Sequence, residues 1–159
     1  MPNDTAGGRR TVRLVGVPVA LYREAQQHTD DLLREVVLMA GYEAAHGGPG
    51  AASRIAEAAD RHRAERHALA VTSERVVAAA TADTVTIEYE VDVSSADSSA
   101  EWGQMLEELA ALCRHGEMLA VPARDQVEAF SRWCCEEFVR QLRDGAEPRA
   151  WDEYALASS

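Results

Sequence analysis

The clearest pattern in the chain is the strict alternation of apolar and polar residues over positions 84–91. Apolar residues occupy every second position and polar residues lie between them: Val85, Ile87, Tyr89 and Val91 against Thr86, Glu88 and Glu90. Because successive side chains of a strand point to opposite faces, this segment is predicted to be a strand with one covered and one exposed face. A looser alternation over 11–17, stopped by Pro18, predicts another strand, and the apolar run 117–121 predicts a third.

Five other segments show the three- and four-residue spacing of apolar positions that is typical of amphipathic helices. They cover approximately 19–41, 51–70, 74–82, 98–115 and 122–144. The second of them has a weak apolar stripe, which consists of Ile55, Ala59, His62, Arg66 and Leu69. In the fourth, Ser98 and Glu101 have the spacing of a capping box, which predicts the start of the helix at Ser98.

The predicted order of elements is β-α-α-α-β-α-β-α. This order indicates an α/β (α+β) fold with a sheet of about three strands and four to five helices. The strand-helix-strand segment over 84–121 has the length of a right-handed crossover unit. A chain of 159 residues has the size of one domain. We expect a disordered tail over 1–10, a single α/β domain over 11–145 and a C-terminal tail over 146–159.

The charge balance is strongly acidic, with 27 acidic against 16 basic residues and a formal net charge of −11. Such a charge repels phosphate groups, so binding to nucleic acid or to an anionic membrane is not expected. Cysteine occurs only at Cys113, Cys134 and Cys135, an odd number that does not indicate a secretory disulfide framework. No signal peptide or membrane-spanning segment is recognisable. A reduced, cytoplasmic protein is therefore expected.

The sequence contains no arrangement that predicts a metal site, a nucleotide-binding loop or any other cofactor site. An enzyme that uses Cys135 as a nucleophile stays open as an alternative, although no base is visible beside that residue. The segment 97–100, Asp-Ser-Ser-Ala, is similar to the phosphorylatable Asp-Ser-Ser-Gly turn of anti-anti-sigma (STAS) domains. Phosphorylation at Ser98 or Ser99 is the corresponding expectation, and the alanine at position 100 departs from the usual glycine.

Several charged and aromatic residues remain once each helix has been given an apolar packing stripe. We interpret them as a surface that recognises a protein partner; they are Asp30, Asp31, Arg34, Glu35, Arg132, Trp133 and Trp151. An alternative of a different class is a small-molecule sensor, because helices on only one side of a small sheet can leave an apolar cleft. Its predicted lining residues are His28, Trp102 and Trp133. The position of His28 on the apolar stripe also allows a purely structural role. Self-association through the weakly striped helices is a further expectation.

The chain as a whole resembles a family of small actinobacterial regulatory proteins. The resemblance rests on the following pieces: Val12-Arg13-Leu14 before Pro18-Val19, His28 with Asp31-Leu32-Leu33-Arg34-Glu35, Leu109 with Cys113, Gly116-Glu117-Met118-Leu119, Phe130-x-Arg132-Trp133, Phe138-Val139-Arg140-Gln141, and Gly145 to Pro148 with Trp151. Members of that family are similar to components encoded near anti-sigma-factor ATP-binding proteins and STAS proteins. The resemblance implies a non-enzymatic regulator that binds a protein partner in sigma-factor partner switching, and it implies no catalytic residues.

Overall fold

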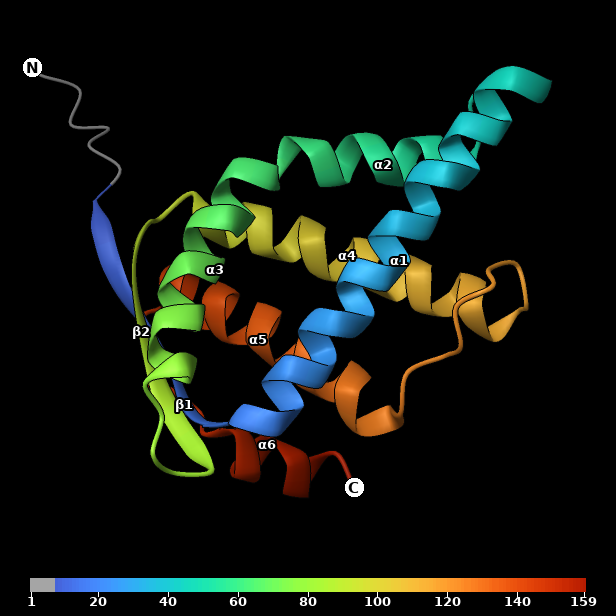
Figure 1. Ribbon diagram of the computed structural model, residues 1–159. Helices are drawn as coiled ribbons and strands as arrows, with labels where there is room; N and C mark the ends of the chain where they lie inside the picture. Colours follow the sequence, from blue (N-terminus) through green and yellow to red (C-terminus); the bar gives the residue numbers. More distant parts are fainter. Residues whose placement is uncertain (1–7) are drawn as a thin grey trace, which may run out of the picture.

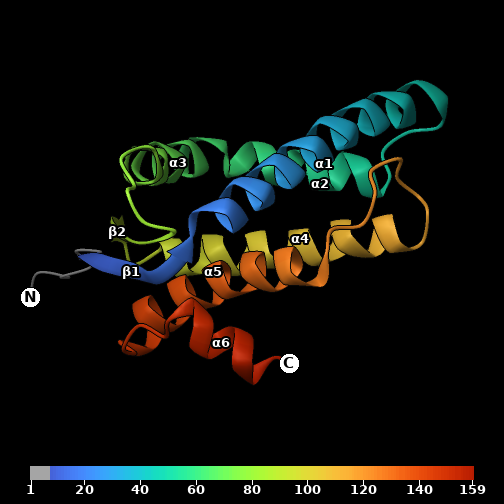
Figure 2. The same ribbon diagram turned by 60° about the horizontal axis from the view of Figure 1, so that its bottom comes forward.

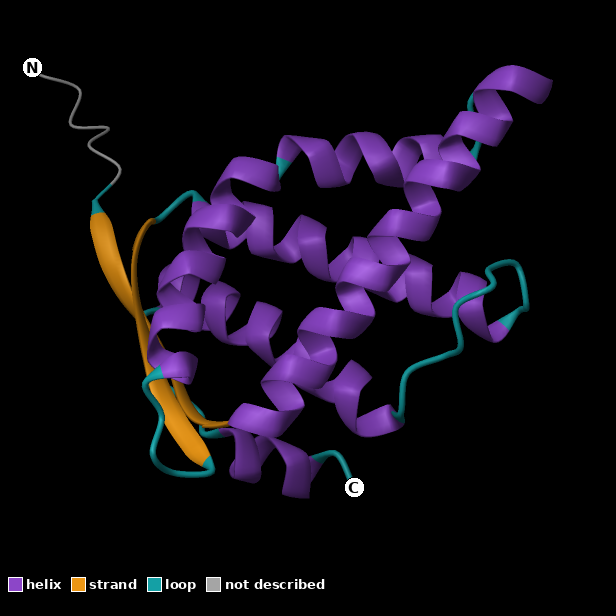
Figure 3. Cartoon of the chain, in the orientation of Figure 1, coloured by secondary structure: helices purple, strands orange, loops and turns teal. Residues whose placement is uncertain are grey.

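The computed structural model describes residues 8–159, and this part of the chain forms an α+β fold (Figure 1). It contains six helices and one two-stranded antiparallel sheet. Figure 3 colours the helices purple and the strands orange. In chain order the elements are β1 (Arg9–Pro18), α1 (Val19–His46), α2 (Ala51–Arg61), α3 (Arg63–Ala78), β2 (Thr84–Asp92), α4 (Ser95–Arg114), α5 (Asp125–Asp144) and α6 (Trp151–Ala157).

The two strands pair along their whole length, with Arg9 opposite Asp92 and Pro18 opposite Thr84. The register shifts between Leu14 and Val17, and Gly16 at this irregularity has a φ of +72°, a conformation that glycine adopts without strain. The predicted alternation in β2 is confirmed. Its apolar residues from position 87 onward are buried, whereas the polar residues between them are exposed.

The predicted third strand is wrong, because residues 117–121 form an irregular loop after α4. Met118 is buried in this loop, whereas Leu119 and Val121 are exposed. The backbone N–H groups of Leu119 and Ala120 donate to the carboxylate of Glu35 on α1 and do not pair with another strand. The predicted crossover unit is therefore absent, and the sheet has two strands where about three were expected.

The helices differ from the prediction in number and in bounds. The predicted helix over 51–70 is broken at His62, so that α2 ends at Arg61 and α3 continues to Ala78. The C-terminal segment, which was predicted to be a tail, contains α6, whose Trp151 and Tyr154 are buried in the core. Within the predicted N-terminal tail, β1 already begins at Arg9. Positions 1–7 of that tail lie outside the described residues.

The helices are arranged in layers, with the sheet at one end of the molecule. In Figure 2, α1, α2 and α3 form one layer, α4 and α5 form a second, and α6 lies on the outer side of α5. Two separate clusters of buried apolar side chains hold the layers together. The cluster nearer the sheet combines residues of β1, β2, α1, α5 and α6 with Val77 of α3 and Ala96 of α4. The second cluster joins α1, α2, α4 and the following loop; its members are Leu32, Val36, Ile55, Met105, Leu109, Cys113 and Met118. Within the described residues, no helix is long and apolar enough to cross a membrane.

Candidate functional site

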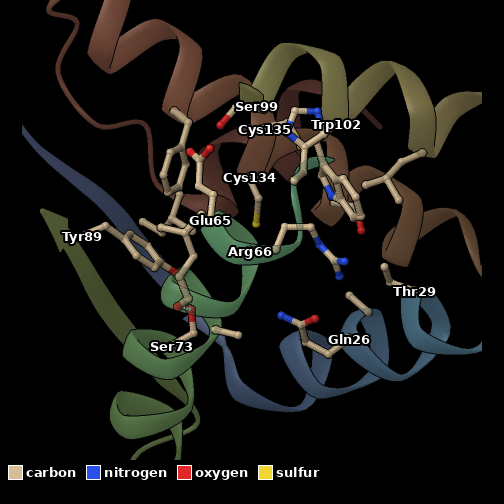
Figure 4. Close-up of a pocket in the computed structure, with 18 of the residues that line it drawn as sticks. Gln26, Thr29, Glu65, Arg66, Ser73, Tyr89, Ser99, Trp102, Cys134 and Cys135 are labelled. Carbon is tan, nitrogen blue, oxygen red and sulfur yellow. Dashed lines mark hydrogen bonds between the residues drawn. The ribbon is translucent and has the colours of Figure 1, made fainter. Parts of the chain in front are cut away.

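A cavity of about 190 Å³ lies between the two helical layers, where the two apolar clusters meet. We call it the first cavity (Figure 4). Its walls come from β1, α1, the His62 break, α3, β2, α4 and α5, and most of the surface that they expose to it is apolar. The lining residues are Leu14, Tyr22, Ala25, Gln26, Thr29, His62, Glu65, Arg66, Leu69, Ala70, Ser73, Tyr89, Ser98, Ser99, Trp102, Leu106, Phe130, Ser131, Cys134, Cys135 and Phe138.

Arg66 is the charged group that distinguishes this cavity. Its side chain extends from α3 between Trp102 on one side and Gln26 and Thr29 of α1 on the other (Figure 4). The guanidinium carbon lies 3.9 Å from the centroid of the Trp102 ring, which is a cation–π contact. Burial lowers the pKa of Arg66, and the negative charge of Asp30 partly opposes this shift. Within residues 8–159 the guanidinium forms no ion pair within 4.0 Å and no hydrogen bond.

His62, at the break between α2 and α3, contacts Glu101 and Trp102 of α4 on this side of the cavity. Its Nε2 lies 3.2 Å from a carboxylate oxygen of Glu101, although the geometry is not that of a hydrogen bond. The other oxygen of Glu101 accepts a hydrogen bond of 2.7 Å from Arg61, and this bond lowers the pKa of Glu101. The His62 ring also meets Trp102 edge to face, with 6.3 Å between ring centroids. These contacts fix Trp102 and the start of α3 on the same side of the cavity.

At the end of the first cavity away from Trp102, the hydroxyl groups of Ser73 and Tyr89 are hydrogen-bonded to each other. Ser73 Oγ donates to the carbonyl of Leu69 at 3.0 Å and lies 2.6 Å from the Tyr89 hydroxyl. Because serine has one hydroxyl hydrogen, Tyr89 must be the donor in the second contact. Burial raises the pKa of Tyr89 well above its ordinary value. Tyr89 is therefore a neutral, fixed donor and not a base.

The two neighbouring thiols on α5 are not activated. Burial raises the pKa of Cys134 well above its ordinary value. Burial, followed by the charges of Glu136 and Glu107, raises the pKa of Cys135 to about 12. A nucleophilic or metal-binding cysteine needs the thiolate form, which is favoured by the opposite shift. The raised pKa values of Cys134 and Cys135 therefore argue against cysteine-dependent catalysis.

A second cavity, of about 570 Å³, adjoins the first between α1, α4 and α5. The two share five lining residues, which are Thr29, Ser99, Leu106, Ser131 and Cys135. The remaining residues of the second cavity are His28, Leu32, Ala100, Gly103, Gln104, Glu107, Ala110, Ala123, Val127, Glu128, Arg132, Glu136, Val139 and Arg140.

The three residues predicted to line one cleft are separated in the structure. Trp102 lines the first cavity and the half-buried His28 lines the second. Trp133 lines neither, because its side chain is completely buried between Phe130 and Trp151. Its indole N–H donates to the carbonyl of Arg149 at 2.9 Å. The prediction of Trp133 as a ligand contact is wrong, because its ring is part of the apolar core.

The residues predicted to form a partner surface divide in a similar way. Asp30, Asp31 and Arg34 are exposed on α1, and Arg34 pairs with Asp31 at 3.0 Å. Arg132 is exposed on α5, where it pairs with Glu107 of α4 at 2.9 Å. Three other predicted members have structural roles instead: Glu35 accepts the two N–H groups of the 117–121 loop, and Trp133 and Trp151 are buried. Buried rings cannot extend a recognition surface, so that part of the prediction is wrong.

Ser98 and Ser99 do not lie in a turn. Helix α4 begins at Ser95, so both serines lie inside it and line the first cavity. Its N-cap residue is Ser94, which contradicts the predicted capping box at Ser98. The helix-strand order that follows the phosphorylatable turn in STAS domains is also absent here, because the 117–121 segment is a loop.

The sequence does contain a signal for this site. Arg66 and His62 stand in the packing stripe predicted for the 51–70 segment, where charged residues are unusual unless they are paired.

The residues described contain no group of three or more histidine, cysteine or acidic side chains that could hold a metal ion. In comparisons with known proteins, no family model, no curated protein and no solved structure matches the chain.

Proposed function

We propose that this protein is a small-molecule-binding regulatory domain whose ligand is an amphipathic monoanion held at Arg66. The observation that carries the proposal is a half-buried guanidinium in a mostly apolar cavity, without an acidic partner among residues 8–159. A charge in such surroundings is costly unless it is paired. A carboxylate on the ligand would supply that partner, since the planar guanidinium donates two parallel hydrogen bonds to a carboxylate.

The surroundings of Arg66 also limit the charge of the ligand. Glu65 and Arg66 both line the first cavity, and Asp30 acts electrostatically on Arg66. These acids disfavour a group with two negative charges, such as a phosphate monoester. A single carboxylate attached to an apolar body fits both the charge and the lining. Catalysis is not part of the proposal, because the thiols and Tyr89 are held in their protonated forms.

Thermal unfolding in the presence of a panel of short monocarboxylates, such as octanoate and phenylacetate, tests the proposal. A ligand at a hundred times its dissociation constant stabilises the folded state by about 2.7 kcal/mol, which gives a clear shift in Tm. We expect the wild-type protein to show this shift and Arg66→Gln to lose it. Arg63→Gln is the matched control, because Arg63 lies on the same helix but is exposed and pairs with Asp60. Equal shifts in all three proteins, or none in the wild type, would refute the proposal.

A second candidate function is binding to a protein partner, and an exposed apolar patch on α1 favours it. Glu35, Leu38 and Tyr42 stand three and four residues apart and so share one side of α1. Leu38 and Tyr42 are 73% and 66% exposed, and Leu119, whose N–H is bonded to Glu35, is 95% exposed. With the charges of Asp31 and Arg34 nearby along α1, this patch has the mixed character of a protein interface.

The resemblance described above suggests sigma-factor partner switching as the setting, in which the partner is an anti-sigma-factor ATP-binding protein or a STAS protein. Affinity capture from an actinobacterial host would be carried out with the wild type and with the double variant Leu38→Glu/Leu119→Glu. Recovery of such a regulator by the wild type alone would support this function. Its equal recovery by the double variant would exclude the patch, and a double variant of Asp31 and Arg34 would then test the charged surface. We also propose a cytoplasmic location, on the basis of the three unpaired cysteines.

A further inference from the structure

The two cavities meet along a wall built from few and mostly small side chains. Of the five residues that line both, four are Thr29, Ser99, Ser131 and Cys135, and only Leu106 is larger. Ser99, Trp102 and Leu106 stand three and four residues apart on α4, so they share one side of the helix. Arg66 stacks on Trp102. The guanidinium therefore lies beside the wall that separates the two cavities.

We propose that the ligand is a linear fatty acid whose carboxylate binds Arg66 and whose chain passes this wall into the second cavity. This inference rests on the proposed function and specifies its ligand class.

The ion pairs of the lining arginines indicate where the carboxylate of the ligand binds. Three arginines line the two cavities, and two of them have acidic partners: Arg132 pairs with Glu107 at 2.9 Å and Arg140 pairs with Glu137 at 2.6 Å. Arg66 forms no ion pair among residues 8–159, as described above. The Thr29 and Ser99 hydroxyls beside the wall also donate no hydrogen bond to another residue in this part of the chain. A carboxylate beside Arg66 would gain a cation that has no acidic partner among residues 8–159, and it would lie next to Thr29 (Figure 4).

Size and lining favour the second cavity for the chain. Its volume is about 570 Å³, against about 190 Å³ for the first. The surface exposed to the second cavity is mostly apolar and includes Leu32, Val127 and Val139. Both of its arginines have acidic partners, Glu107 for Arg132 and Glu137 for Arg140. A chain of methylene groups would therefore meet mostly apolar surface there.

The experiment is a chain-length series from hexanoate to tetradecanoate, with each acid used below its micellar concentration and its affinity measured by calorimetry. Each methylene buried in the second cavity should tighten binding about fourfold, until the cavity is full. Dodecanoate should therefore bind on the order of a hundredfold more tightly than octanoate. Arg66→Gln should weaken every member of the series by a similar factor.

Two variants test which cavity holds the alkyl chain of the ligand. Ala110 lines only the second cavity and Ala70 lines only the first. Ala110→Phe should leave the affinity for hexanoate within about twofold and remove the gain with chain length, whereas Ala70→Phe should keep that gain. Circular dichroism and urea unfolding of each variant show whether it is folded. If either variant does not fold, Ala110→Leu or Ala70→Leu takes its place.

The outcomes separate the two proposals. If short acids bind through Arg66 but affinity does not increase with chain length, the proposed function holds and the fatty-acid inference fails. If Ala70→Phe removes the gain and Ala110→Phe keeps it, the chain occupies the first cavity and the inference also fails. If no acid of any length binds, both proposals fail.

Discussion

Glu137 is a completely buried carboxylate that joins three parts of the molecule. It accepts hydrogen bonds from Arg140 at 2.6 Å, from Gln141 at 3.0 Å and from the backbone N–H of Arg149 at 3.0 Å. Gln141 in turn bonds both the N–H and the carbonyl of Arg13 on β1. A single side chain therefore connects α5 to the sheet and to the segment that leads into α6. Its full hydrogen bonding explains why burial of this charge is tolerated.

Removal of Glu137 should be costly, because the buried Gln141 and the half-buried Arg140 and Arg149 would lose their acceptor. Each buried donor left unsatisfied costs about 1–3 kcal/mol, so Glu137→Ala should lower the free energy of unfolding by about 3 kcal/mol or more. The neighbouring Glu136→Ala is the matched control. Glu136 is 43% exposed and has one ion pair, so its removal should cost less than about 1 kcal/mol. Urea unfolding monitored by tryptophan fluorescence measures both, and similar losses in the two variants would contradict this account.

The thiols of α5 give a second prediction at the scale of single residues. The raised pKa of Cys135, about 12 against an ordinary value of 9.0, lowers its thiolate fraction at pH 7.5 on the order of a thousandfold. Iodoacetamide should accordingly alkylate Cys134 and Cys135 very slowly in the folded protein and rapidly in urea. Mass spectrometry of time points identifies the modified residue. Rapid alkylation of Cys135 in the folded protein at neutral pH would instead support thiol chemistry.

At the scale of elements, Glu43 of α1 acts as the cap of the next helix. Its carboxylate accepts the backbone N–H groups of Gly50, Ala52 and Ser53 and the hydroxyl of Ser53. These are donors at the start of α2 that have no partner within the helix. A Cβ at position 50 would lie only 2.8 Å from the Glu43 carboxylate, so a larger residue at that position would displace this side chain. The distal end of α1 and the start of α2 are thereby held together.

The Glu43 cap should make stability depend on pH in the acidic range. The hydroxyl and N–H of Ser53, with the other two N–H groups, hold the pKa of Glu43 below its ordinary value of 4.5. The unfolded chain therefore takes up the proton first, and the stabilisation is complete above pH 4.5 and is lost as the pH falls through the lowered pKa. The difference in Tm between wild type and Glu43→Gln should be constant from neutral pH to about pH 5 and should decrease below it. Glu57→Gln, at an exposed position of α2 with no ion pair, should show no such trend.

The local pattern of apolar residues was sufficient to predict some helices and strands but not others. Strand β2 and helices α1, α4 and α5 were predictable, because their apolar periodicity is long or strict. The 117–121 segment was not, because its four consecutive apolar residues, 118–121, are compatible with a strand or a loop, and the choice depends on Glu35, more than 80 residues earlier in the chain. Trp133 and Trp151 likewise became core residues through contacts with each other across α5 and α6. Their burial depends on packing between helices, which the pattern of apolar residues along one helix does not indicate.

For the molecule as a whole, the important feature is that the core is divided. The cluster near the sheet and the cluster at the far end meet at the first cavity, and Arg61, His62 and Glu101 form the polar contact beside it. The composition indicated a single mixed domain, but it could not indicate a cavity, because the first cavity is created by the packing of segments from both strands and several helices. Two core units with a hollow junction can move relative to each other more readily than one continuous core.

This division predicts an uneven pattern of amide hydrogen exchange in the free protein, and a ligand at Arg66 should add protection around the first cavity. Without ligand, amides of α2 and the distal half of α1 should exchange faster than those of β2 and α5, which belong to the cluster packed on the sheet. An acid bound at Arg66 would contact α1, α3, α4 and α5 at once, so saturating octanoate should slow exchange in α3 and around His62 as well as at the cavity walls. Arg66→Gln should show the uneven pattern but no protection by octanoate. Uniform exchange in the free protein would contradict the divided core, whereas protection limited to exposed helix faces would place the ligand outside the first cavity.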